Sequence, residues 1–297
     1  MKSDILISGG TSFIGYNLIK LLDKNKYNIT SLSLKKISNK NKIKNIKYIF
    51  CDISKKSNLK KKIKKNYDIF INFAGNINHK ASLENKKVHY YGLKNILEII
   101  NKKKIKLLIQ IGSSLEYGQL VSPQTEKTKC KPVSSYGKAK YLSSKYVLEL
   151  GIKNSVILRP YQIYGPHQKK DRLIPQAIKT FLGNLKLKCT HGNQRRDFLY
   201  VDDFNRLILY ILKKKYINSG IYNVGSGKPV KIKKIINLIL KKINKGQAKF
   251  GSIQMRDDEI NDLYPDISKI KKNFKWKPRI SLKDGLAKTI NFYLKKV

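Results

Sequence analysis

Short apolar runs alternate with amphipathic segments over about the first 160 residues of the chain. The runs are rich in Ile and Leu, whereas the amphipathic segments repeat apolar residues every three or four positions, as Ile14, Leu18 and Leu21 do. Strands are therefore expected at 4–8, 27–33, 46–51, 67–73, 106–112 and 154–158, and helices at 13–22, 88–101 and 136–150. Alternating strands and helices predict an α/β fold, a doubly wound parallel sheet covered on both faces.

The chain after Gly165 follows this alternation less regularly. Turn signals occur at 183–184, 192–193 and 225–227, and the chain has no internal repeat and no low-complexity linker. We therefore expect a smaller lobe attached to the sheet domain rather than a second, linked domain.

The composition adds a large positive charge, because 64 Lys and Arg face 19 Asp and Glu, which gives a net charge of +45. Such a charge invites a nucleic-acid interpretation. However, the Lys residues are spread along the whole chain, and no zinc finger, helix-turn-helix or RNA-binding aromatic motif accompanies them. We expect solvated surface charge and no specific nucleic-acid partner, with a non-catalytic polyanion-binding protein as the distant alternative. With 41% hydrophobic residues, the chain is not expected to be disordered.

Cysteine usage and hydropathy bear on the compartment. Cys51, Cys130 and Cys189 are far apart and odd in number, so they predict neither a metal site nor a disulfide framework and fit a reducing cytoplasm. The four histidines show no metal-ligand pattern. No stretch reaches the ~18 apolar residues of a membrane span, so we expect a cytoplasmic protein without a membrane partner.

The few arginines are more informative than the many lysines. Only seven of the 64 basic residues are Arg. Arg can grip a phosphate with two hydrogen bonds in one plane, which Lys cannot do. A chain that uses Lys almost everywhere is expected to keep Arg where this geometry matters. Five of the seven, Arg159, Arg172, Arg195, Arg196 and Arg256, lie in or beside the segments of the family resemblance given below, which makes them the phosphate-binding candidates.

The motif Gly9-Gly10-Thr11-Ser12-Phe13-Ile14-Gly15 joins the first expected strand to the first helix. Gly9 suits a tight turn, Gly15 allows close packing of helix on strand, and the N–H groups at the helix start can bind a pyrophosphate. The context predicts a dinucleotide site, with contacts from Gly9, Thr11, Ser12, Phe13, Ile14 and Gly15.

The residues after the second and third strands bear on the choice of dinucleotide. The second strand ends at Ser33, where a carboxylate would bind the ribose hydroxyls of NAD. Ser33 with the nearby Lys35 would instead accept the extra phosphate of NADP, so the sequence favours NADP over NAD. Asp52 and Ile53 are placed to border the adenine, although Asp52 could equally be a loop or cap residue.

Tyr136 and Lys140 lie four residues apart, on one face of an expected helix. Ser113 stands at the carboxyl end of the preceding strand, where such folds place their chemistry. A neighbouring ammonium favours the phenolate of a tyrosine whose pKa is ordinarily about 10. Tyr136 could then exchange a proton with a substrate oxygen while Ser113 hydrogen-bonds that oxygen. These three residues form the predicted catalytic set, and Tyr136 and Lys140 also line the cofactor.

Together these residues resemble the extended short-chain dehydrogenase/reductase family, that is, the NAD-dependent epimerase/dehydratase family, in its nucleotide-sugar branch. The resemblance covers nearly the whole chain. Further similar segments are Asn72-Phe73-Ala74-Gly75, Arg159-Pro160-Tyr161-Gln162-Ile163-Tyr164-Gly165-Pro166, Gln194-Arg195-Arg196-Asp197-Phe198-Leu199-Tyr200-Val201-Asp202-Asp203 and Tyr222-Asn223-Val224-Gly225-Ser226-Gly227.

The resemblance implies a Rossmann domain over 1–165 and about 197–224, with a smaller C-terminal substrate-binding lobe over 166–196 and 225–297. It also implies a homodimer through the helices at about 88–101 and 136–150. The residues that it assigns to the cofactor are Phe73, Ala74 and Gly75, and those that it assigns to a nucleotide-sugar substrate are Ser114, Gln162, Arg172, Leu173, Ile174, Arg196 and Arg256. Among these, Arg196 and Arg256 would hold the diphosphate.

Two departures from the family pattern affect the expected reaction. Ser12 replaces the middle Gly of the turn, which predicts a slightly wider turn near the pyrophosphate. Sugar 4,6-dehydratases of this branch carry an Asp-Glu pair after the catalytic hydroxyl, where this chain has Ser114 and Leu115. Dehydration is therefore not expected.

The segment 112–118 looks most like reductases of GDP- or dTDP-linked 4-keto-6-deoxyhexoses. We expect NAD(P)H-dependent reduction of such a sugar nucleotide, in the synthesis of surface-polysaccharide sugars. A 4-epimerase that keeps NAD tightly bound is the alternative.

Overall fold

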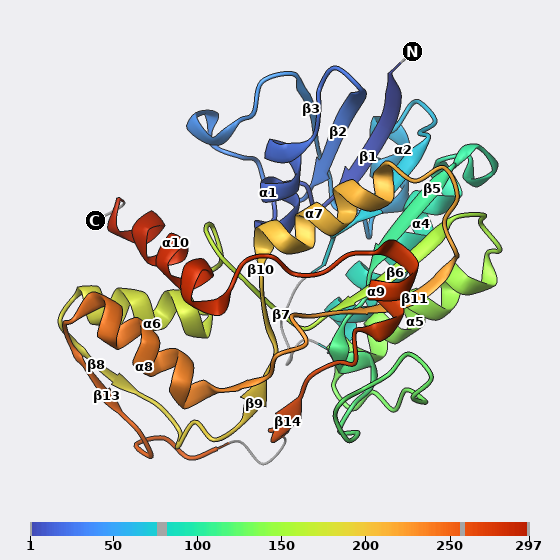
Figure 1. Ribbon diagram of the computed structural model, residues 1–297. Coiled ribbons are helices and arrows are strands. Elements are labelled where there is room, and N and C mark those ends of the chain that lie inside the picture. The colour runs from blue at the N-terminus through green and yellow to red at the C-terminus, as the bar shows by residue number, and fades with distance from the viewer. Residues whose placement is uncertain (1, 76–81, 256–258, 296–297) are drawn as a thin grey trace. The chain divides into compact units, whose positions relative to one another are not determined.

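The computed structural model describes residues 2–75, 82–255 and 259–295, and the chain divides into two units (Figure 1). The first unit comprises 1–120, 126–160 and 205–223, and the second comprises 121–125, 161–204 and 224–297. The expected division, with a boundary at 165 and a returning segment at about 197–224, stays a prediction.

A seven-stranded sheet forms the centre of the first unit, with the strand order β11-β6-β5-β4-β1-β2-β3. The strands are β1 (Ser3–Ser8), β2 (Tyr27–Ser33), β3 (Ile46–Phe50), β4 (Ile69–Asn72), β5 (Leu107–Ile111), β6 (Ser155–Pro160) and β11 (Gly220–Val224). All neighbours from β3 to β6 pair in parallel. Every residue of β4 and β5 is buried, which explains why these strands are continuous apolar runs. The predicted doubly wound α/β fold is confirmed.

Helices of the first unit follow the strands in sequence. They are α1 (Phe13–Leu21), α2 (Lys56–Lys62), α3 (Ser82–Lys86), α4 (Gly92–Ile99) and α5 (Ser135–Glu149), with the short 3-10 turns η1 (Asn39–Asn41), η3 (Lys102–Lys104) and η4 (Ser114–Glu116). A π-helical turn, η2 (Lys87–Tyr91), links α3 to α4, so the single helix expected at 88–101 is wrong in its bounds. Helix α7 (Val201–Leu212) begins in the second unit and continues into the first.

The core of the first unit joins the sheet to these helices. Leu93, Ile96 and Leu97 of α4 are buried in one apolar cluster with Phe70 of β4 and Leu108 of β5. Burial of these side chains gives the fold most of its driving force, at about 25 cal/mol per Å² of apolar surface. It also fixes where the carboxyl ends of β1, β4 and β5 lie.

The described residues of the second unit form three small sheets and a group of helices. Its strands are β7 (Gln162–Tyr164) with β10 (Phe198–Tyr200), β9 (Arg195–Arg196) between β12 (Val230–Lys231) and β14 (Asp262–Leu263), and β8 (Lys186–Lys188) with β13 (Gln247–Lys249). Its helices are α6 (Leu173–Leu182), α8 (Ile232–Ile243), α9 (Ser268–Phe274) and α10 (Leu282–Leu294).

Helix α8 packs against both α6 and α10 (Figure 1). Each of the three helices buries an apolar face, as Ile235, Ile236 and Ile239 show for α8. The expectation of a less regular chain after Gly165 is therefore wrong for these segments, because their apolar residues recur at helical spacing.

Candidate active site

The Gly-rich turn lies where β1 ends and α1 begins. Gly9 has a φ of +75°, and a Cβ there would lie 2.8 Å from the backbone nitrogen of Ala74, so a side chain is excluded. Gly15 packs directly against the Gly9 carbonyl. Ser12 caps α1, because its Oγ accepts a hydrogen bond from Gly15 N at 3.3 Å. A cradle that any Cβ would fill, at a helix N-terminus, fits a dinucleotide pyrophosphate.

Ser33 lies beside this turn at the end of β2. Its Oγ accepts a hydrogen bond from Thr11 N at 3.1 Å, and the residue is buried. Lys35, two residues further on, is exposed. The hydroxyl therefore stabilises the Gly-rich turn, and β2 ends in this hydroxyl rather than in a carboxylate.

Asp52 follows β3 and closes a local turn. Its Oδ1 accepts hydrogen bonds from Ser54 N at 2.9 Å and from Ser54 Oγ at 2.7 Å. This is the loop role that the sequence left open for Asp52. Ile53 is buried, and its side chain would meet a Cβ placed on Gly92 of α4.

The loop after β4 is held next to the Gly-rich turn. Asn72 Nδ2 donates to Gln110 Oε1 at 2.8 Å, and Asn72 Oδ1 accepts from Ala74 N at 3.1 Å. Phe73 N donates to Ser8 O at the end of β1, at 2.8 Å. The chain order of the sheet reverses between β1 and β4, and doubly wound folds bind ligands at such a switch point. Two of the three predicted cofactor residues of this loop therefore lie beside the Gly-rich turn.

Tyr136 and Lys140 occupy the first half of α5 and are both buried. Lys140 Nζ lies 5.9 Å from the centroid of the Tyr136 ring and donates to Ile111 O, at the end of β5, at 2.7 Å. Burial lowers the pKa of Lys140 from 10.5 to about 8, and the charge of Glu116 opposes this shift. A protonated Lys140 at this distance favours the phenolate of Tyr136.

Ser113 lies at the carboxyl end of β5 and caps η4. Its Oγ accepts from Leu115 N at 3.2 Å, and its own N–H donates to Glu116 Oε1 at 2.8 Å. A Cβ on Gly137 would lie 2.5 Å from Leu115 O, so the first turn of α5 packs directly on η4. The structure thus places the three predicted catalytic residues on two elements in contact.

His89 is a buried residue of this cluster that the sequence analysis examined only as a metal ligand. Its ring centroid lies 5.1 Å from that of Tyr136, at an interplanar angle of 86°. Ser143 Oγ of α5 donates to His89 O at 2.9 Å, and a Cβ on Gly75 would overlap the imidazole. His89 therefore packs between the cofactor loop and the catalytic helix. The π-helical turn that carries it is a feature often found at functional sites, but it leaves no signal in the sequence.

Arg159 does not serve a phosphate, contrary to the prediction from Arg usage. The residue is 1% exposed, and its guanidinium pairs with Glu116 at 2.7 Å. Arg195 is also engaged, because Nε and Nη2 donate to the two carboxylate oxygens of Asp262 at 2.7 and 2.6 Å. Both arginines use their planar geometry on a carboxylate of the protein.

Arg196, in the second unit, is buried and bonded to the segment before β14. Its Nη1 donates to Arg195 O at 2.8 Å and to Asn261 O at 3.0 Å, and its Nη2 is paired with Glu259. The next residue, Asp197, accepts from Ser226 N at 2.5 Å and holds the turn that follows β11. In this conformation Arg196 holds the segment that precedes β14 through these bonds. Arg256 lies outside the described residues.

The remaining predicted substrate residues differ in exposure. Ser114 is buried in η4 of the first unit. In the second unit Gln162 is exposed on β7, Arg172 is the N-cap residue of α6 and is partly exposed, Leu173 is partly exposed and Ile174 is buried. Their contact with a substrate stays a prediction.

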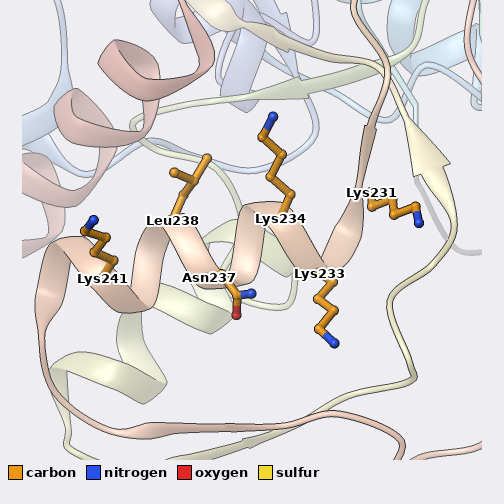
Figure 2. A pocket seen from close by; sticks show the side chains of 6 residues that line it. All are labelled: Lys231, Lys233, Lys234, Asn237, Leu238 and Lys241. Carbon is orange, nitrogen blue, oxygen red and sulfur yellow. The ribbon is translucent and has the colours of Figure 1, made fainter.

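A hollow of about 400 Å³ lies on helix α8 of the second unit (Figure 2). It is lined by Lys231, Lys233, Lys234, Asn237, Leu238 and Lys241. None of these residues belongs to a predicted site, and the lysines are the solvated charge expected of an amphipathic surface helix. We therefore place the candidate active site in the first unit.

Two absences hold for the part of the chain that the structure describes. No group of three His, Cys, Asp or Glu in it could hold a metal ion. No helix in it is long and apolar enough to span a membrane.

Comparison with known families and proteins matches this architecture. Residues 5–225 match the model of the NAD dependent epimerase/dehydratase family. The chain is 30% identical to a putative UDP-glucose 4-epimerase of Methanocaldococcus jannaschii, over 97% of either chain. It is 31% identical to a UDP-glucuronate 4-epimerase of Thermodesulfobacterium geofontis, over 97% of this chain and 95% of that one. It is 28% identical to a CDP-abequose synthase of Salmonella muenchen, over 98% of either chain.

Solved structures share the fold at lower identity. UDP-glucose 4-epimerase of Thermotoga maritima, with UDP-glucose, superimposes with a TM-score of 0.87 at 23% identity, over 99% of either chain. dTDP-glucose 4,6-dehydratase of Bacillus anthracis, in complex with NAD, gives a TM-score of 0.85 at 23% identity, over 99% of this chain and 97% of that one.

Proposed function

Since the chain belongs to the NAD dependent epimerase/dehydratase family, we propose that it reduces a nucleotide-activated 4-keto-6-deoxyhexose with a nicotinamide cofactor. The observation that carries this proposal is the buried pair of Tyr136 and Lys140 packed on the Ser113 turn, a turn whose described residues offer no unpaired acid for water elimination. Ser114 and Leu115 follow Ser113, and the only carboxylate of the turn, Glu116, is paired with Arg159. The similarity to a CDP-abequose synthase supports a deoxysugar product.

The residues of the first unit would hold the cofactor along the switch point of the sheet. The backbone of Gly9–Gly15 would bind the pyrophosphate at the start of α1, and the loop 73–75 would line the nicotinamide half. When bound, the reduced nicotinamide supplies a hydride. We propose that it can come from NADPH or NADH. β2 ends in Ser33 rather than in a carboxylate, which favours NADPH, whereas the dehydratase with the same fold was solved with NAD.

The protein's own part in the reaction is to move one proton. The substrate oxygen would lie within hydrogen-bond reach of Ser113 Oγ and Tyr136 Oη. Tyr136 donates its proton to this oxygen as the alcohol forms, and the Lys140 ammonium stabilises the phenolate left behind. Ser113 keeps the oxygen in place through its hydroxyl.

The second candidate is a 4-epimerase, which would use the same three residues. It is favoured by the two relatives named as 4-epimerases, at 30% and 31% identity over almost the whole chain. An epimerase returns the hydride to the other face of the sugar and needs no added cofactor. The two candidates therefore differ in whether cofactor is consumed.

A panel of sugar nucleotides with dTDP, GDP, CDP and UDP, assayed with NADPH and with NADH, tests the proposal. The expected result is oxidation of reduced nicotinamide in proportion to a 4-keto-6-deoxy sugar nucleotide. Conversion of a UDP-hexose without added cofactor would establish the epimerase instead. Elimination of water from an NDP-hexose would contradict both candidates.

Replacing Tyr136→Phe should lower kcat by about 10² to 10⁴-fold while leaving cofactor affinity nearly unchanged, because only the proton donor is lost. Tyr141→Phe is the matched control, since Tyr141 is a partly exposed residue of the same helix. Cofactor affinity is measured by fluorescence of the bound reduced nicotinamide. Equal turnover in the two variants would remove Tyr136 from the mechanism.

A further inference from the structure

Glu116 is a fully buried carboxylate at the centre of the candidate site, and the proposed reaction gives it no chemical step. Its exposed fraction is 0%, and it lies in η4, three residues after Ser113. A buried charge is costly unless hydrogen bonds and an opposite charge compensate it. The partners of Glu116 therefore indicate what the carboxylate is kept for.

The two carboxylate oxygens of Glu116 bind different parts of the site. Oε1 accepts from Ser113 N at 2.8 Å and from Ser144 Oγ of α5 at 3.0 Å. Oε2 accepts from Arg159 Nε at 2.9 Å and Arg159 Nη2 at 2.7 Å. The guanidinium lies 4.6 Å from the centroid of the Tyr117 ring. One carboxylate thus joins the turn after β5, the catalytic helix and strand β6.

We propose that Glu116 is a positioning residue of the active site, which fixes the Ser113 turn against the helix that carries Tyr136 and Lys140. This inference rests on the proposed function, which assigns the catalytic roles to the residues that Glu116 positions. Ser113 N–H and Ser144 Oγ share Oε1, so a movement of the turn relative to α5 breaks a hydrogen bond to a charged group, which is among the stronger kind. The ion pair with Arg159 keeps Glu116 in one orientation, because both groups are buried.

Glu116 also contributes charge to the site. It is the acid whose field raises the pKa of Lys140, against the desolvation that lowers it. Other titratable groups described around this cluster are Tyr136 on α5, His89 on η2, Tyr117 after η4, Cys130, Arg159 and Glu126, whose charge acts on Tyr117. Burial is also the main cause that raises the pKa of Tyr117, to about 12. Glu116 is therefore expected to be the negative charge opposite the Lys140 ammonium.

The test compares Glu116→Gln with Glu149→Gln. Glutamine keeps an oxygen for Ser113 N–H and removes the charge, whereas Glu149 is an exposed residue of α5 paired only with Lys145 among the described residues. The pKa of Lys140 is read by NMR on protein with ¹³C at lysine Cε, because it titrates below the surface lysines. Lys140→Arg assigns the signal. The measurement needs no substrate, so it is independent of the proposed function.

Glu116→Gln should lower the titration midpoint of Lys140 by at least about half a pH unit, since an opposing charge is lost. It should also lower kcat by about tenfold or more, with little change in KM for the cofactor. Glu149→Gln should leave both values unchanged. An unchanged midpoint and an unchanged kcat in Glu116→Gln would overturn the proposal.

Ser144→Ala provides a second variant in case Glu116→Gln does not fold, because it removes one hydrogen bond and leaves the ion pair intact. It should lower kcat by about fivefold. It should lower the thermal stability of the cofactor complex less than loss of the Glu116–Arg159 ion pair would. Wild-type kcat in a folded Ser144→Ala would refute the positioning role. If the wild type converts no sugar nucleotide, the proposed function fails, and the Lys140 midpoint alone decides the role of Glu116.

Discussion

The charge of Lys140 affects both the proposed reaction and the stability of the first unit. Its ammonium is buried beside Tyr136 and hydrogen-bonded to Ile111 O. The proposed reaction needs the charge there, because it stabilises the phenolate. Folding, in contrast, is opposed by desolvation of the same charge. The pKa of about 8, below the ordinary 10.5, records this cost.

Lys140 should therefore make stability depend on pH in a defined window. Below about pH 8 it is protonated in both the folded and the unfolded chain, and the cost of the buried charge is complete. Between about 8 and 10.5 the folded chain loses the proton first, so the stability contributed by this residue rises with pH, by about 3 kcal/mol in total.

Lys140→Met removes the buried charge, so its advantage in free energy of unfolding over the wild type should be greatest near neutral pH. The advantage should shrink by up to about 3 kcal/mol as the pH approaches 10.5. Urea unfolding at several pH values measures it, with Lys138→Met as the control, since Lys138 is an exposed residue of the same helix. A difference between Lys140→Met and wild type that does not vary with pH would contradict the account.

The sequence predicted residues whose role follows from their spacing along the chain. It missed residues whose role depends on contacts with distant positions. The spacing of Tyr136 and Lys140 places both on one helical face, and the structure has them so. Glu116 gains its role from Arg159, 43 positions away. Because the sequence does not reveal this pairing, it indicated Arg159 as a phosphate ligand. His89 is similar, because nothing in the sequence brings it to Tyr136.

At the scale of elements, the strand–turn–helix unit β1–α1 has little freedom to change at Gly9. A Cβ on Gly9 would meet the backbone of the loop after β4 at 2.8 Å. Both the turn and this neighbouring loop therefore require glycine at this position. Gly151 has a similar positive φ of +60°, but nothing lies within 4 Å of its Cβ position. Substitutions at these two glycines therefore separate the free-energy cost of the backbone conformation from the cost of steric crowding.

Gly9→Ala should therefore cost more than Gly151→Ala. The control pays only the conformational penalty, about 1–2 kcal/mol, whereas Gly9→Ala adds about 1–3 kcal/mol of crowding. Gly9→Ala should also weaken binding of NADPH or NADH, since the turn moves. Urea unfolding and cofactor titration check both effects. Equal unfolding free energies in the two variants would show that the turn is not packed as described.

Elements with a strong apolar pattern were predicted, and those without one were not. The bounds of β2 agree with the expected 27–33, because its apolar residues are flanked by turns. Helix α2 buries only Leu59 in a run of lysines, so it left no periodicity to detect. The π-helical turn η2 interrupts the expected helix, and the apolar periodicity of the segment gave no sign of it.

At the scale of the whole molecule, the excess of Lys is a source of repulsion. The chain has 64 basic and 19 acidic residues, and most of its ion pairs in the described part are at least partly exposed. Exposed pairs of this kind contribute little, about 0–1 kcal/mol each. The repulsion among the remaining lysines acts over about 10 Å at moderate salt. The predicted absence of a specific nucleic-acid partner stays a prediction.

Salt should therefore stabilise the protein. Raising NaCl from about 20 to 300 mM should raise Tm by about 2 °C or more, because screening reduces repulsion between like charges. A titration at alkaline pH, where lysines lose their charge, is the control and should show a smaller effect. A Tm that falls with added salt at neutral pH would mean that attractive charge pairs dominate the surface.

The sequence predicted a sheet domain that ends at 165 and returns at about 197–224, and this division stays a prediction. The returning segment 205–223 adds the edge strand β11 to the sheet of the first unit, and its limits follow from packing that no local pattern records. The proposal that the first unit binds the cofactor rests on the Gly-rich turn and the switch point. The expectation that the second unit binds the nucleotide sugar comes from the family resemblance and stays a prediction.

Transfer of deuterium tests the central claim most directly. The protein is incubated with a 4-keto-6-deoxy sugar nucleotide and nicotinamide cofactor that carries deuterium at the hydride position, and the product is read by NMR. The account predicts one deuterium at C4 of the sugar for each cofactor oxidised, and transfer that is about 10² to 10⁴-fold slower in Tyr136→Phe. A sugar converted without deuterium at C4, or transfer at the wild-type rate in Tyr136→Phe, would contradict it.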